Sequence, residues 1–469
     1  MIVNIKGLFD TDFDIDITGI SYDSRLTEPG DMFVAISGYK TDGHIYAAQA
    51  AEKGAVCVVG EHDIGGLKIP FIKVENSREA LAKAAHTFFN FPSKQLKLIG
   101  VTGTNGKTTT TYLIKHILEC NCHKVGLIGT NQNLIGQKVI ESQHTTPESY
   151  ELAKLLRQMA EEGCDYVVME VSSHSLELHR VDYCDFLFAV FTNLTQDHLD
   201  FHLSMEQYAN AKMKLFNMCR YGIINSDDIF GDQIINALPH KCESYGIETG
   251  TVRAENIKTN VGGIEFDCLG QHIILGIPGR FSVYNALGAI ALAHSVGIGI
   301  NEIASALKKA PGVKGRVEIV PVDTDYTVLI DYAHTPDGLK KLLETAREFV
   351  KGRLVVLFGC GGDRDKTKRP LMGKIAGELA DYCIVTSDNP RTEEPAAIIR
   401  DILTGMKDAV AEYIVVENRR DAIEFALNNA IAGDVILLAG KGHETYQILA
   451  DRTIHFDERE IIRQIIQGR

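Results

Sequence analysis

The sequence predicts an α/β protein with three domains. A chain of 469 residues is longer than one hydrophobic core usually holds, so about three domains of roughly 150 residues are expected. Short apolar runs alternate with helical stretches along most of the chain, which indicates mainly parallel sheets covered by helices. Breaks in that alternation near residues 91–94 and 314–318 divide the chain into residues 1–95, 96–313 and 314–469.

The composition is that of an ordinary globular protein that works in water. The formal net charge of −14 argues against bulk binding of nucleic acid or of an anionic membrane surface. The ten cysteines are scattered and several lie in apolar runs, which is typical of reduced core residues. No apolar run is long enough to span a bilayer, and the first seven residues form no export signal. We therefore expect a cytoplasmic protein without membrane insertion or nucleic-acid partners, and we take it to be a monomer.

The first 95 residues predict a small N-terminal α/β domain. Two apolar runs, 31–38 and 55–60, flank a helical stretch at 47–52. Ser24 lies in the polar cluster Asp23-Ser24-Arg25, which taken alone is most often a turn with a salt bridge.

A glycine-containing segment follows the first apolar run of the central domain. The run 96–101 precedes Thr102-Gly103-Thr104-Asn105-Gly106-Lys107-Thr108-Thr109, and residues 112–118 repeat apolar side chains at helical spacing. In such a strand, loop and helix, backbone N–H groups surround phosphate oxygens, the lysine neutralises the terminal phosphates and the threonine can ligate Mg²⁺. Val101 replaces the usual first glycine, so the loop is a variant. We predict a phosphate-loop ATPase-type parallel sheet that binds a nucleoside triphosphate; the alternative is a glycine-rich turn with a surface lysine.

Two later apolar runs of the central domain end in polar residues. Glu170 follows the run 166–169, and His198 lies beyond the run 186–191. Ligands of parallel sheets bind at the carboxyl ends of strands, so both side chains are candidate metal ligands beside the nucleotide loop. Glu170 could instead cap the next segment, and His198 could be structural because Mg²⁺ prefers oxygen.

Two further polar residues lie on helical stretches. Taken alone, Lys212 is a solvated helix lysine. Asn285 opens an alanine-rich helix and either reaches a base or caps a turn. Their residue types do not decide between these possibilities.

After residue 314 the chain predicts a second sheet, in a C-terminal Rossmann-like α/β domain. Strand-like runs each end in a polar motif, and the motifs are Asp331-Tyr332-Ala333-His334, Gly361-Gly362-Asp363-Arg364, Asp388-Asn389-Pro390-Arg391 and Gly440-Lys441-Gly442-His443-Glu444. Arg364 and Arg391 could clamp a carboxylate, and Glu444 could hold an ammonium group. Each is as often a surface salt-bridge residue, but several such loops on one sheet edge favour a ligand site.

Taken together, these motifs resemble the Mur ligase family along essentially the whole chain. The resemblance rests on the phosphate loop and on the order of Glu170-Val171-Ser172-Ser173-His174, Thr192-Asn193-Leu194 with Asp197-His198, Ala211-Lys212 and Asp331-Tyr332-Ala333-His334. It implies an ATP-dependent ligase of peptidoglycan synthesis that forms an amide bond. Asp23-Ser24-Arg25, Thr145-Thr146-Pro147 and Gly440 to Glu444 resemble the member that adds a diamino acid to UDP-N-acetylmuramoyl-L-alanyl-D-glutamate. Asp388 to Arg391 resembles the form selective for meso-diaminopimelate, whose extra carboxylate needs a cation.

The resemblance also implies roles for single residues. ATP would be held by Gly103, Thr104, Asn105, Gly106, Lys107, Thr108, Thr109, Asn285, Arg316 and Asp331, and Mg²⁺ by Thr108, Glu170, His198 and Lys212. Lys212 matches a carbamylated lysine, which reverses its interpretation as a solvated side chain. The catalytic residues would be Lys107, Lys212, His198 and Arg316. The muramoyl substrate would contact Ser24, Thr145, Thr146, Ser172 and Arg180, and diaminopimelate would contact Arg364, Asp388, Asn389, Pro390, Arg391, Gly440 and Glu444.

The expected reaction adds meso-diaminopimelate to the D-glutamate carboxyl of the acceptor through an acyl phosphate, with release of ADP and phosphate. One departure concerns Leu178, which stands where some relatives carry a polar residue, so that substrate contact is in doubt. Two other interpretations stay open. The first is a related ligase, which adds either lysine or, as a folylpolyglutamate synthetase does, glutamate. The second is a protein that binds ATP as a structural ligand without turnover. The added amino acid and the release of ADP distinguish them.

Overall fold

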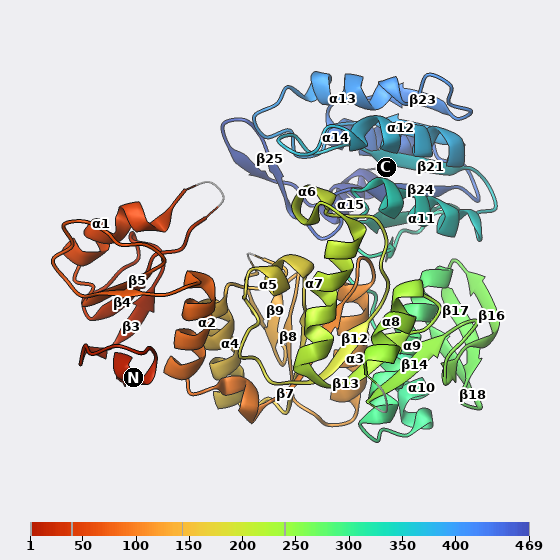
Figure 1. The fold of residues 1–469 in the computed structure, drawn as a ribbon. Coiled ribbons are helices and arrows are strands. Elements are labelled where there is room, and N and C mark those ends of the chain that lie inside the picture. The colour runs from red at the N-terminus through yellow and green to blue at the C-terminus, as the bar shows by residue number, and fades with distance from the viewer. Residues whose placement is uncertain (1, 39–40, 143, 239–240, 469) are drawn as a thin grey trace. The chain divides into compact units, whose positions relative to one another are not determined.

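The computed structural model describes residues 2–38, 41–142, 144–238 and 241–468 (Figure 1). The chain divides into two compact units. The first comprises Met1–Ser244 and Ala291–Val296, and the second comprises Tyr245–Ile290 and Gly297–Arg469.

The first unit begins with a four-stranded parallel sheet of order β3-β4-β5-β6. Alternate residues of β4 pack on opposite faces, so that Met32 and Val34 share a core with α2 while Phe33 shares one with α1. Burial on both faces explains why the strand is a continuous apolar run in the sequence. The elements are β1 (Val3–Asn4), η1 (Ile5–Gly7), β2 (Asp16–Ile17), β3 (Gly19–Ser21), β4 (Asp31–Val34), η2 (Gly43–Tyr46), α1 (Ala47–Glu52), β5 (Cys57–Gly60), β6 (Phe71–Lys73) and α2 (Ser77–Phe88).

A nine-stranded sheet of order β10-β9-β8-β11-β7-β12-β13-β14-β15 follows. Strands β8, β11, β7, β12 and β13 run parallel, and β9 with β10 forms an antiparallel edge. The strands are β7 (Lys97–Thr102), β8 (Val125–Ile128), β9 (Asn133–Ile135), β10 (Lys138–Ile140), β11 (Tyr166–Glu170), β12 (Phe186–Phe191), β13 (Cys219–Asn225), β14 (Cys242–Gly246) and β15 (Val252–Arg253).

Strand β7 lies between β11 and β12, and this pairing positions the site. Val101 lies opposite Glu170 on one side, and Thr102 lies opposite Phe191 on the other. The carboxyl ends of the three strands therefore meet at one edge of the sheet, where ligands of parallel sheets bind. The helices of this region are η3 (Pro92–Gln95), α3 (Lys107–Cys120), α4 (Ser149–Glu161), α5 (Ser173–Glu177), α6 (Leu199–His202), α7 (Met205–Met218) and α8 (Ile229–Ala237).

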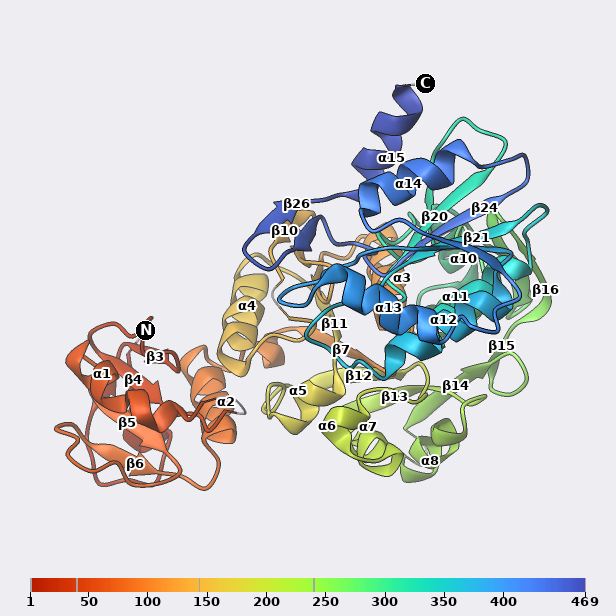
Figure 2. The same cartoon turned by 90° about the horizontal axis from the view of Figure 1, so that it is seen from above.

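Within the first unit, helix α2 lies beside α4 (Figures 1 and 2). Arg78 Nη1 on α2 lies 3.5 Å from Glu148 Oε2, at the residue that precedes α4. The hydroxyl of Tyr22 donates to Glu151 Oε2 over 2.8 Å. These contacts attach the four-stranded sheet to the nine-stranded one.

The second unit holds a three-stranded antiparallel sheet and a six-stranded sheet of order β19-β20-β24-β21-β22-β23. In the larger sheet only β19 runs antiparallel to its neighbour among the described pairs. Alternate residues of β21 face different cores: Val356 packs with α11, α12 and α13, and Leu357 packs with α14 and α15. Helices therefore cover both faces of the sheet.

The strands of this unit are β16 (Glu255–Asn260), β17 (Gly263–Cys268), β18 (Gln271–Leu275), β19 (Glu318–Val320), β20 (Thr327–Asp331), β21 (Leu354–Phe358), β22 (Tyr382–Val385), β23 (Glu412–Val415), β24 (Val435–Ala439), β25 (Tyr446–Ile448) and β26 (Thr453–His455). The helices are α10 (Ile300–Lys308), α11 (Pro336–Arg347), α12 (Lys368–Leu379), α13 (Pro395–Thr404), α14 (Arg419–Asn428) and α15 (Glu458–Gln467), with α9 (Arg280–Ser295) shared between the two units.

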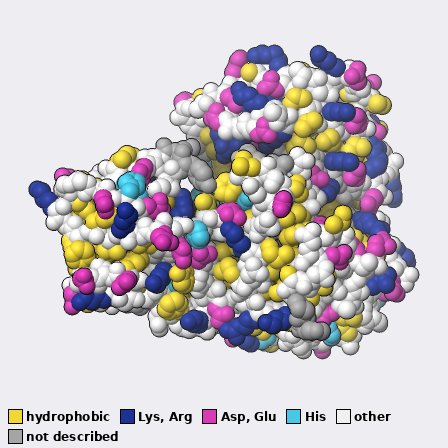
Figure 3. All heavy atoms as spheres, viewed as in Figure 1, with side chains coloured by type: hydrophobic (Ala, Val, Ile, Leu, Met, Phe, Trp, Pro, Cys, Tyr) yellow, Lys and Arg dark blue, Asp and Glu magenta, His cyan; other side chains and the backbone are white. Residues whose placement is uncertain are grey.

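The predicted α/β fold class is confirmed, because each large sheet is mainly parallel and is packed with helices. The domain boundaries stay a prediction; they fall between η3 and β7 and between α10 and β19. None of the helices in the described ranges combines the length and apolar character that crossing a membrane requires. On the face drawn in Figure 3, acidic and basic side chains are interspersed.

One histidine is fully buried where α2 meets the nine-stranded sheet. His86 has no exposed surface, its Nε2 lies 3.6 Å from Cys184 Sγ, and no described residue contacts its Nδ1 through a hydrogen bond. Burial disfavours the charged imidazolium and lowers the pKa of His86 to about 4, against a small opposing effect of Asp182. The folded chain therefore holds this imidazole neutral at neutral pH.

This burial predicts a pH dependence of stability. The unfolded state binds a proton at His86 below about pH 6.5, whereas the folded state binds it only below about pH 4. The free energy of unfolding therefore decreases as the pH falls through that window. His86→Gln should remove about 2 kcal/mol of the stability lost between pH 7 and pH 5. Urea unfolding at the two pH values measures it, with His62→Gln at an exposed histidine as the control. Equal pH dependence in wild type and His86→Gln would contradict the prediction.

Candidate active site

The loop between β7 and α3 is braced by the segment that follows β12. Gly103 has a φ of +146°, and a Cβ there would lie 1.9 Å from Thr192 Oγ1. The amides of Thr104 and Asn105 donate to Asn193 O and Asn193 Oδ1 over 2.8 and 3.0 Å. The close approach explains why glycine stands at position 103.

Helix α3 begins at Lys107 directly behind this loop. Its N-cap residue is Gly106, with a φ of +85°, which has no side chain to satisfy the N–H groups of the first turn. Those groups and the helix dipole make the start of α3 suitable for an anion. Lys107 Nζ donates to the carbonyls of Gly103 and Thr104, each over 2.9 Å, so its charge lies at the loop.

The carboxylate of Glu170 ends β11 and is 1% exposed. Its Oε2 accepts from Thr108 Oγ1 and Thr130 Oγ1, both over 3.0 Å, and its Oε1 accepts from Thr130 N over 2.9 Å. Thr108 and Glu170 therefore present oxygen atoms side by side at the end of the sheet. Thr130 follows β8 and was not predicted; its place just beyond a strand end was the available signal.

Four of the predicted substrate residues gather around this carboxylate. Thr145 Oγ1 lies 3.0 Å from Thr130 Oγ1, and Thr146 Oγ1 donates to Glu170 O over 2.9 Å. The Ser172 amide donates to Thr146 Oγ1 over 3.1 Å, and Arg180 Nη1 donates to Thr146 O over 3.2 Å. The fifth, Ser24, lies in the four-stranded sheet domain and donates to Gln49 Oε1 over 2.8 Å, beside an ion pair of Asp23 and Arg25.

Lys212 on α7 is 1% exposed, so its interpretation as a solvated lysine is wrong. Its Nζ lies 4.4 Å from the centre of the Tyr208 ring, and Tyr208 OH lies 3.1 Å from Thr104 Oγ1 in the loop before α3. Burial, assisted by the charge of Lys107, holds the pKa of Lys212 well below its usual value. Burial thus favours the neutral amine form of this side chain.

His198 lies near this lysine but is more open. Its backbone has a φ of +54°, its ring is 6.2 Å from the Tyr208 ring, and its Nε2 lies 3.5 Å from Asp197 Oδ2. The His174 ring lies 4.9 Å away. The ring arrangement keeps an imidazole close to the loop without burying it.

In the second unit, polar residues collect at the carboxyl end of β20. The carboxylate of Asp331 accepts from the amides of Val317 and Ala333, each over 2.7 Å, and burial raises its pKa against the opposing charge of Arg316. The Arg316 guanidinium carbon lies 5.1 Å from the centre of the Tyr332 ring, and the His443 ring lies 4.8 Å from the same ring. Burial and nearby cations lower the pKa of His443 to about 4. Asn285 lies on α9 in this unit and is 5% exposed.

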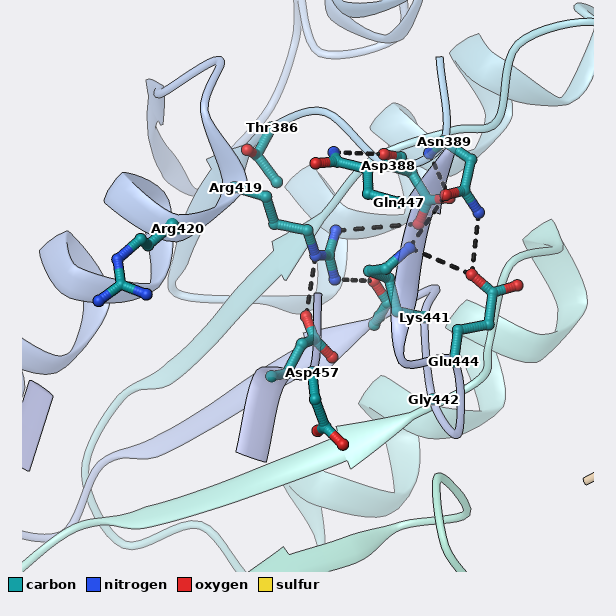
Figure 4. A network of polar contacts seen from close by, with 12 residues as sticks. Thr386, Asp388, Asn389, Arg419, Arg420, Lys441, Gly442, Glu444, Gln447 and Asp457 are labelled. Carbon is teal, nitrogen blue, oxygen red and sulfur yellow. Dashed lines mark hydrogen bonds and ion pairs between the residues drawn. The ribbon is translucent and has the colours of Figure 1, made fainter. Parts of the chain in front are cut away.

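A second group of predicted residues lies where β22 and β24 end (Figure 4). Asn389 Nδ2 donates to Glu444 Oε2 over 2.9 Å. Gly440 has a φ of +112°, and a Cβ there would lie 2.7 Å from Asp388 Oδ2, so a larger residue would collide with that carboxylate. Pro390 follows Asn389 and orients the turn that leads to Arg391, whose φ is +53°.

The two predicted arginines of this region flank a glycine. A Cβ on Gly361 would lie 2.9 Å from Arg391 Nη1 and 3.8 Å from Arg364 Cγ. Arg391 Nη1 donates to Gly362 O over 2.8 Å, while Arg364 is exposed and donates to the carbonyl of Asp363. Both guanidinium groups thus lie at the loop that contains Gly361. Arg391 is hydrogen-bonded to this loop, whereas Arg364 is exposed.

Another polar cluster, in the four-stranded sheet domain, is explained by the fold. Asp42, His44 and His62 bring two imidazoles and a carboxylate together. The Glu61 amide donates to His44 Nε2 over 2.8 Å, so Nδ1 carries the proton and donates to Asp42 Oδ1 over 2.6 Å. The His62 ring stacks on His44 at 3.8 Å. Both nitrogens of the buried histidine are therefore already used.

Comparison with known proteins assigns the chain to a family. Models of the Mur ligase family match the chain as its catalytic domain over residues 16–89, its middle domain over 101–293 and its glutamate ligase domain over 315–442. The UDP-N-acetylmuramoyl-L-alanyl-D-glutamate–2,6-diaminopimelate ligase of Caldanaerobacter subterraneus subsp. tengcongensis is 52% identical over 459 residues, covering 96% of this chain and 95% of that protein. The chain belongs to the Mur ligase family. The resemblance predicted from the motifs is confirmed.

Solved structures of Mur ligases share this fold. A structure of a UDP-N-acetylmuramoyl-L-alanyl-D-glutamate–2,6-diaminopimelate ligase matches 100% of this chain and 99% of its own with a TM-score of 0.71 and 32% identity. The MurF ligase from Thermotoga maritima in complex with ADP matches 96% of this chain and 97% of its own, with a TM-score of 0.61 and 18% identity. The second match shows the fold alone.

The geometry of Gly103 predicts the effect of a side chain there. In Gly103→Ala the added methyl would collide with Thr192, so the loop must move, and we expect ATP binding to weaken at least about tenfold, or ~1.4 kcal/mol. Calorimetric titration with a non-hydrolysable ATP analogue measures it. Gly163→Ala is the matched control, because that glycine also has a positive φ but no atom within 4 Å of an added Cβ. Unchanged affinity in Gly103→Ala would refute the argument.

Proposed function

We propose that this chain is the ATP-dependent ligase that adds meso-diaminopimelate to UDP-N-acetylmuramoyl-L-alanyl-D-glutamate in peptidoglycan precursor synthesis. The observation that carries the proposal is the identity of about half of all residues, along nearly the whole chain, with a relative named for that reaction. The monomeric state and the cytoplasmic location stay predictions from the sequence.

The phosphate loop supports a role for Gly103, Thr104, Asn105, Gly106, Lys107, Thr108 and Thr109 in holding the phosphates of ATP. The N-terminus of α3, whose N-cap residue is a glycine, would offer its helix dipole and N–H groups to the phosphates, and Lys107 would supply a positive charge. The adjacent oxygens of Thr108 and Glu170 fit Mg²⁺, which prefers oxygen ligands, and His198 and Lys212 would complete its surroundings. Bound there, the ion would neutralise phosphate charge. In the second unit, Asn285, Arg316 and Asp331 are proposed ATP contacts.

The proposed reaction has two steps. The D-glutamate carboxylate of the acceptor attacks the terminal phosphorus, the bond to ADP breaks, and an acyl phosphate forms on the acceptor. A neutral amine of diaminopimelate then attacks the acyl carbon and loses a proton, and phosphate leaves as the amide forms. Lys107 and Arg316 would stabilise the negative charge on the transferring group. Ser24, Thr145, Thr146, Ser172 and Arg180 would hold the acceptor, with Leu178 making no polar contact to it.

The buried amine of Lys212 is suited to carbamylation. A neutral amine attacks the carbon of CO₂ and releases a proton, which turns the lysine into an anion. Burial lowers the pKa of Lys212 and so favours the neutral form that this reaction needs. The resulting carbamate would offer oxygens beside the phosphate loop.

Carbamylation of Lys212 predicts a signal from labelled bicarbonate. Enzyme equilibrated with ¹³C-bicarbonate should show one carbamate carbon by NMR, and Lys212→Arg should abolish it because the guanidinium stays charged. Lys214→Arg, two residues along α7 at a side chain 44% exposed, should retain it and serves as the control. A carbamate signal that survives Lys212→Arg would rule out this lysine as its source.

The amino-acid site supports the choice of diaminopimelate. Glu444 offers a carboxylate to an ammonium group, and Arg391, with Arg364 nearby, offers a cation to the second carboxylate. Asp388, Asn389, Pro390 and Gly440 would shape the pocket between them. Lysine lacks that second carboxylate, so Arg391 would not increase the affinity of the site for lysine.

The decisive experiment is phosphate release from ATP with the muramoyl acceptor, comparing meso-diaminopimelate, L-lysine, L-glutamate and no amino acid. We expect release with diaminopimelate alone. Arg391→Ala should lower kcat/KM for diaminopimelate at least about tenfold because the second carboxylate loses its cation. Arg400→Ala, at an arginine whose side chain is 67% exposed, is the matched control.

The other outcomes select the alternatives. Release with lysine would identify a lysine-adding ligase, and release with glutamate and another acceptor would identify an enzyme like folylpolyglutamate synthetase. No release with any amino acid would indicate that ATP is a structural ligand.

A further inference from the structure

A buried lysine lies between two residues of the proposed amino-acid site. Lys441 follows β24 and has no exposed surface. Its Nζ lies 3.1 Å from Asn389 Oδ1 and 3.1 Å from Glu444 Oε2 (Figure 4). The Tyr446 and Phe456 rings lie 5.9 Å from the same Nζ. Of the motif 440–444, the sequence predicts only Gly440 and Glu444 as site residues, and not Lys441.

Lys441 is one of three groups that fix how the amide of Asn389 is turned. Asn389 Oδ1 accepts from Lys441 and from the Ile448 amide over 3.0 Å, while its Nδ2 donates to Glu444 Oε2. Turning the amide over would place its NH₂ group against two donors and its oxygen against a carboxylate. Asn389 is 3% exposed, so water cannot readily replace these partners.

The same contacts direct the carboxylate of Glu444. Oε2 receives donors from both Lys441 and Asn389, whereas no described residue donates to Oε1. One oxygen is therefore held and the other is left for a ligand. An ammonium group is the complement of a carboxylate oxygen presented in this way.

The arginine that would bind the second carboxylate is attached to the same framework. The Arg391 amide donates to Ile448 O over 3.2 Å, and Gln447 Nε2 donates to Asp388 O over 2.7 Å. Strand β25 thus fixes the segment from Asp388 to Arg391 next to the Lys441 contacts. One set of hydrogen bonds therefore fixes the position of Glu444, the proposed ammonium-binding group, relative to Arg391, the proposed carboxylate-binding group.

We propose that Lys441 is a positioning residue of the amino-acid site. Together with Asn389 it holds Glu444 Oε2, so that Glu444 Oε1 is presented to an ammonium group of the incoming diamino acid. The inference rests on the proposed function, because it acts on the binding of that substrate. Without the lysine, Glu444 Oε2 loses one of its two donors, and Asn389 Oδ1 loses one of its two donors. The defect falls on binding of the diamino acid and not on ATP.

The test is a double-mutant cycle with Lys441→Met, Glu444→Gln and the double variant, assayed by ADP release while diaminopimelate is varied. Lys441→Met should raise KM for diaminopimelate about tenfold or more, with kcat within about threefold and KM for ATP unchanged. The double variant should be no worse than the poorer single variant, because both changes act through one carboxylate. Lys441→Gln, which keeps a donor without the charge, should recover part of the loss.

Controls separate this role from a general loss of structure. Lys374→Met on α12, at a side chain 64% exposed, should behave as wild type. Thermal unfolding curves show whether Lys441→Met and Lys441→Gln are folded. One folded variant is enough for the double-mutant cycle. Multiplying effects in the double variant, an unchanged KM, or a parallel change of kcat and of KM for ATP would overturn the assignment of Lys441. Wild-type enzyme without diaminopimelate-dependent ADP release would instead overturn the proposed function and this inference with it.

Discussion

The buried carboxylate of Glu170 is the contact on which the site of the first unit depends. A carboxylate that is 1% exposed must find donors, and here they come from Thr108 at the start of α3 and from Thr130 after β8. Satisfying one side chain thus connects the phosphate loop to a neighbouring strand end. Through Thr146, which donates to the Glu170 carbonyl, the same strand end also places the proposed acceptor-binding residues.

In the second unit, buried cations hold the loops at the strand ends. Arg419, 1% exposed, donates to Glu458 Oε1 and to the Ala439 carbonyl over 2.8 and 2.9 Å. Arg459 joins Glu318 to the carbonyl of Gly442. Both partners of the first pair are buried, so removing either would leave a buried charge without its hydrogen-bonded partner. The beginning of α15 therefore holds the loop after β24 and the first residue of β19 in place.

Burial also sets which protonation state each site presents. It favours the neutral forms of Lys212, His443 and Asp331, although nearby charges assist it at the first two and oppose it at the third. The neutral form of an amine is its nucleophilic form toward CO₂. A neutral imidazole at His443 avoids charge repulsion with the nearby cations, among them Arg316 and Arg459. The same physical cause thus prepares different chemistry in the two units.

Local patterns in the sequence were sufficient for the α/β class, the phosphate loop and the polar strand ends, because strand, turn and helix signals act over a few residues. Tertiary structure alone decided which of these residues are buried and which partners they meet. Lys212 has the sequence context of a surface lysine, and only packing of α7 hides it. Asn389 and Lys441 are 52 residues apart, and only the order of β24, β21 and β22 brings them together. Desolvation and long-range hydrogen bonding depend on the whole fold, and no local periodicity encodes them.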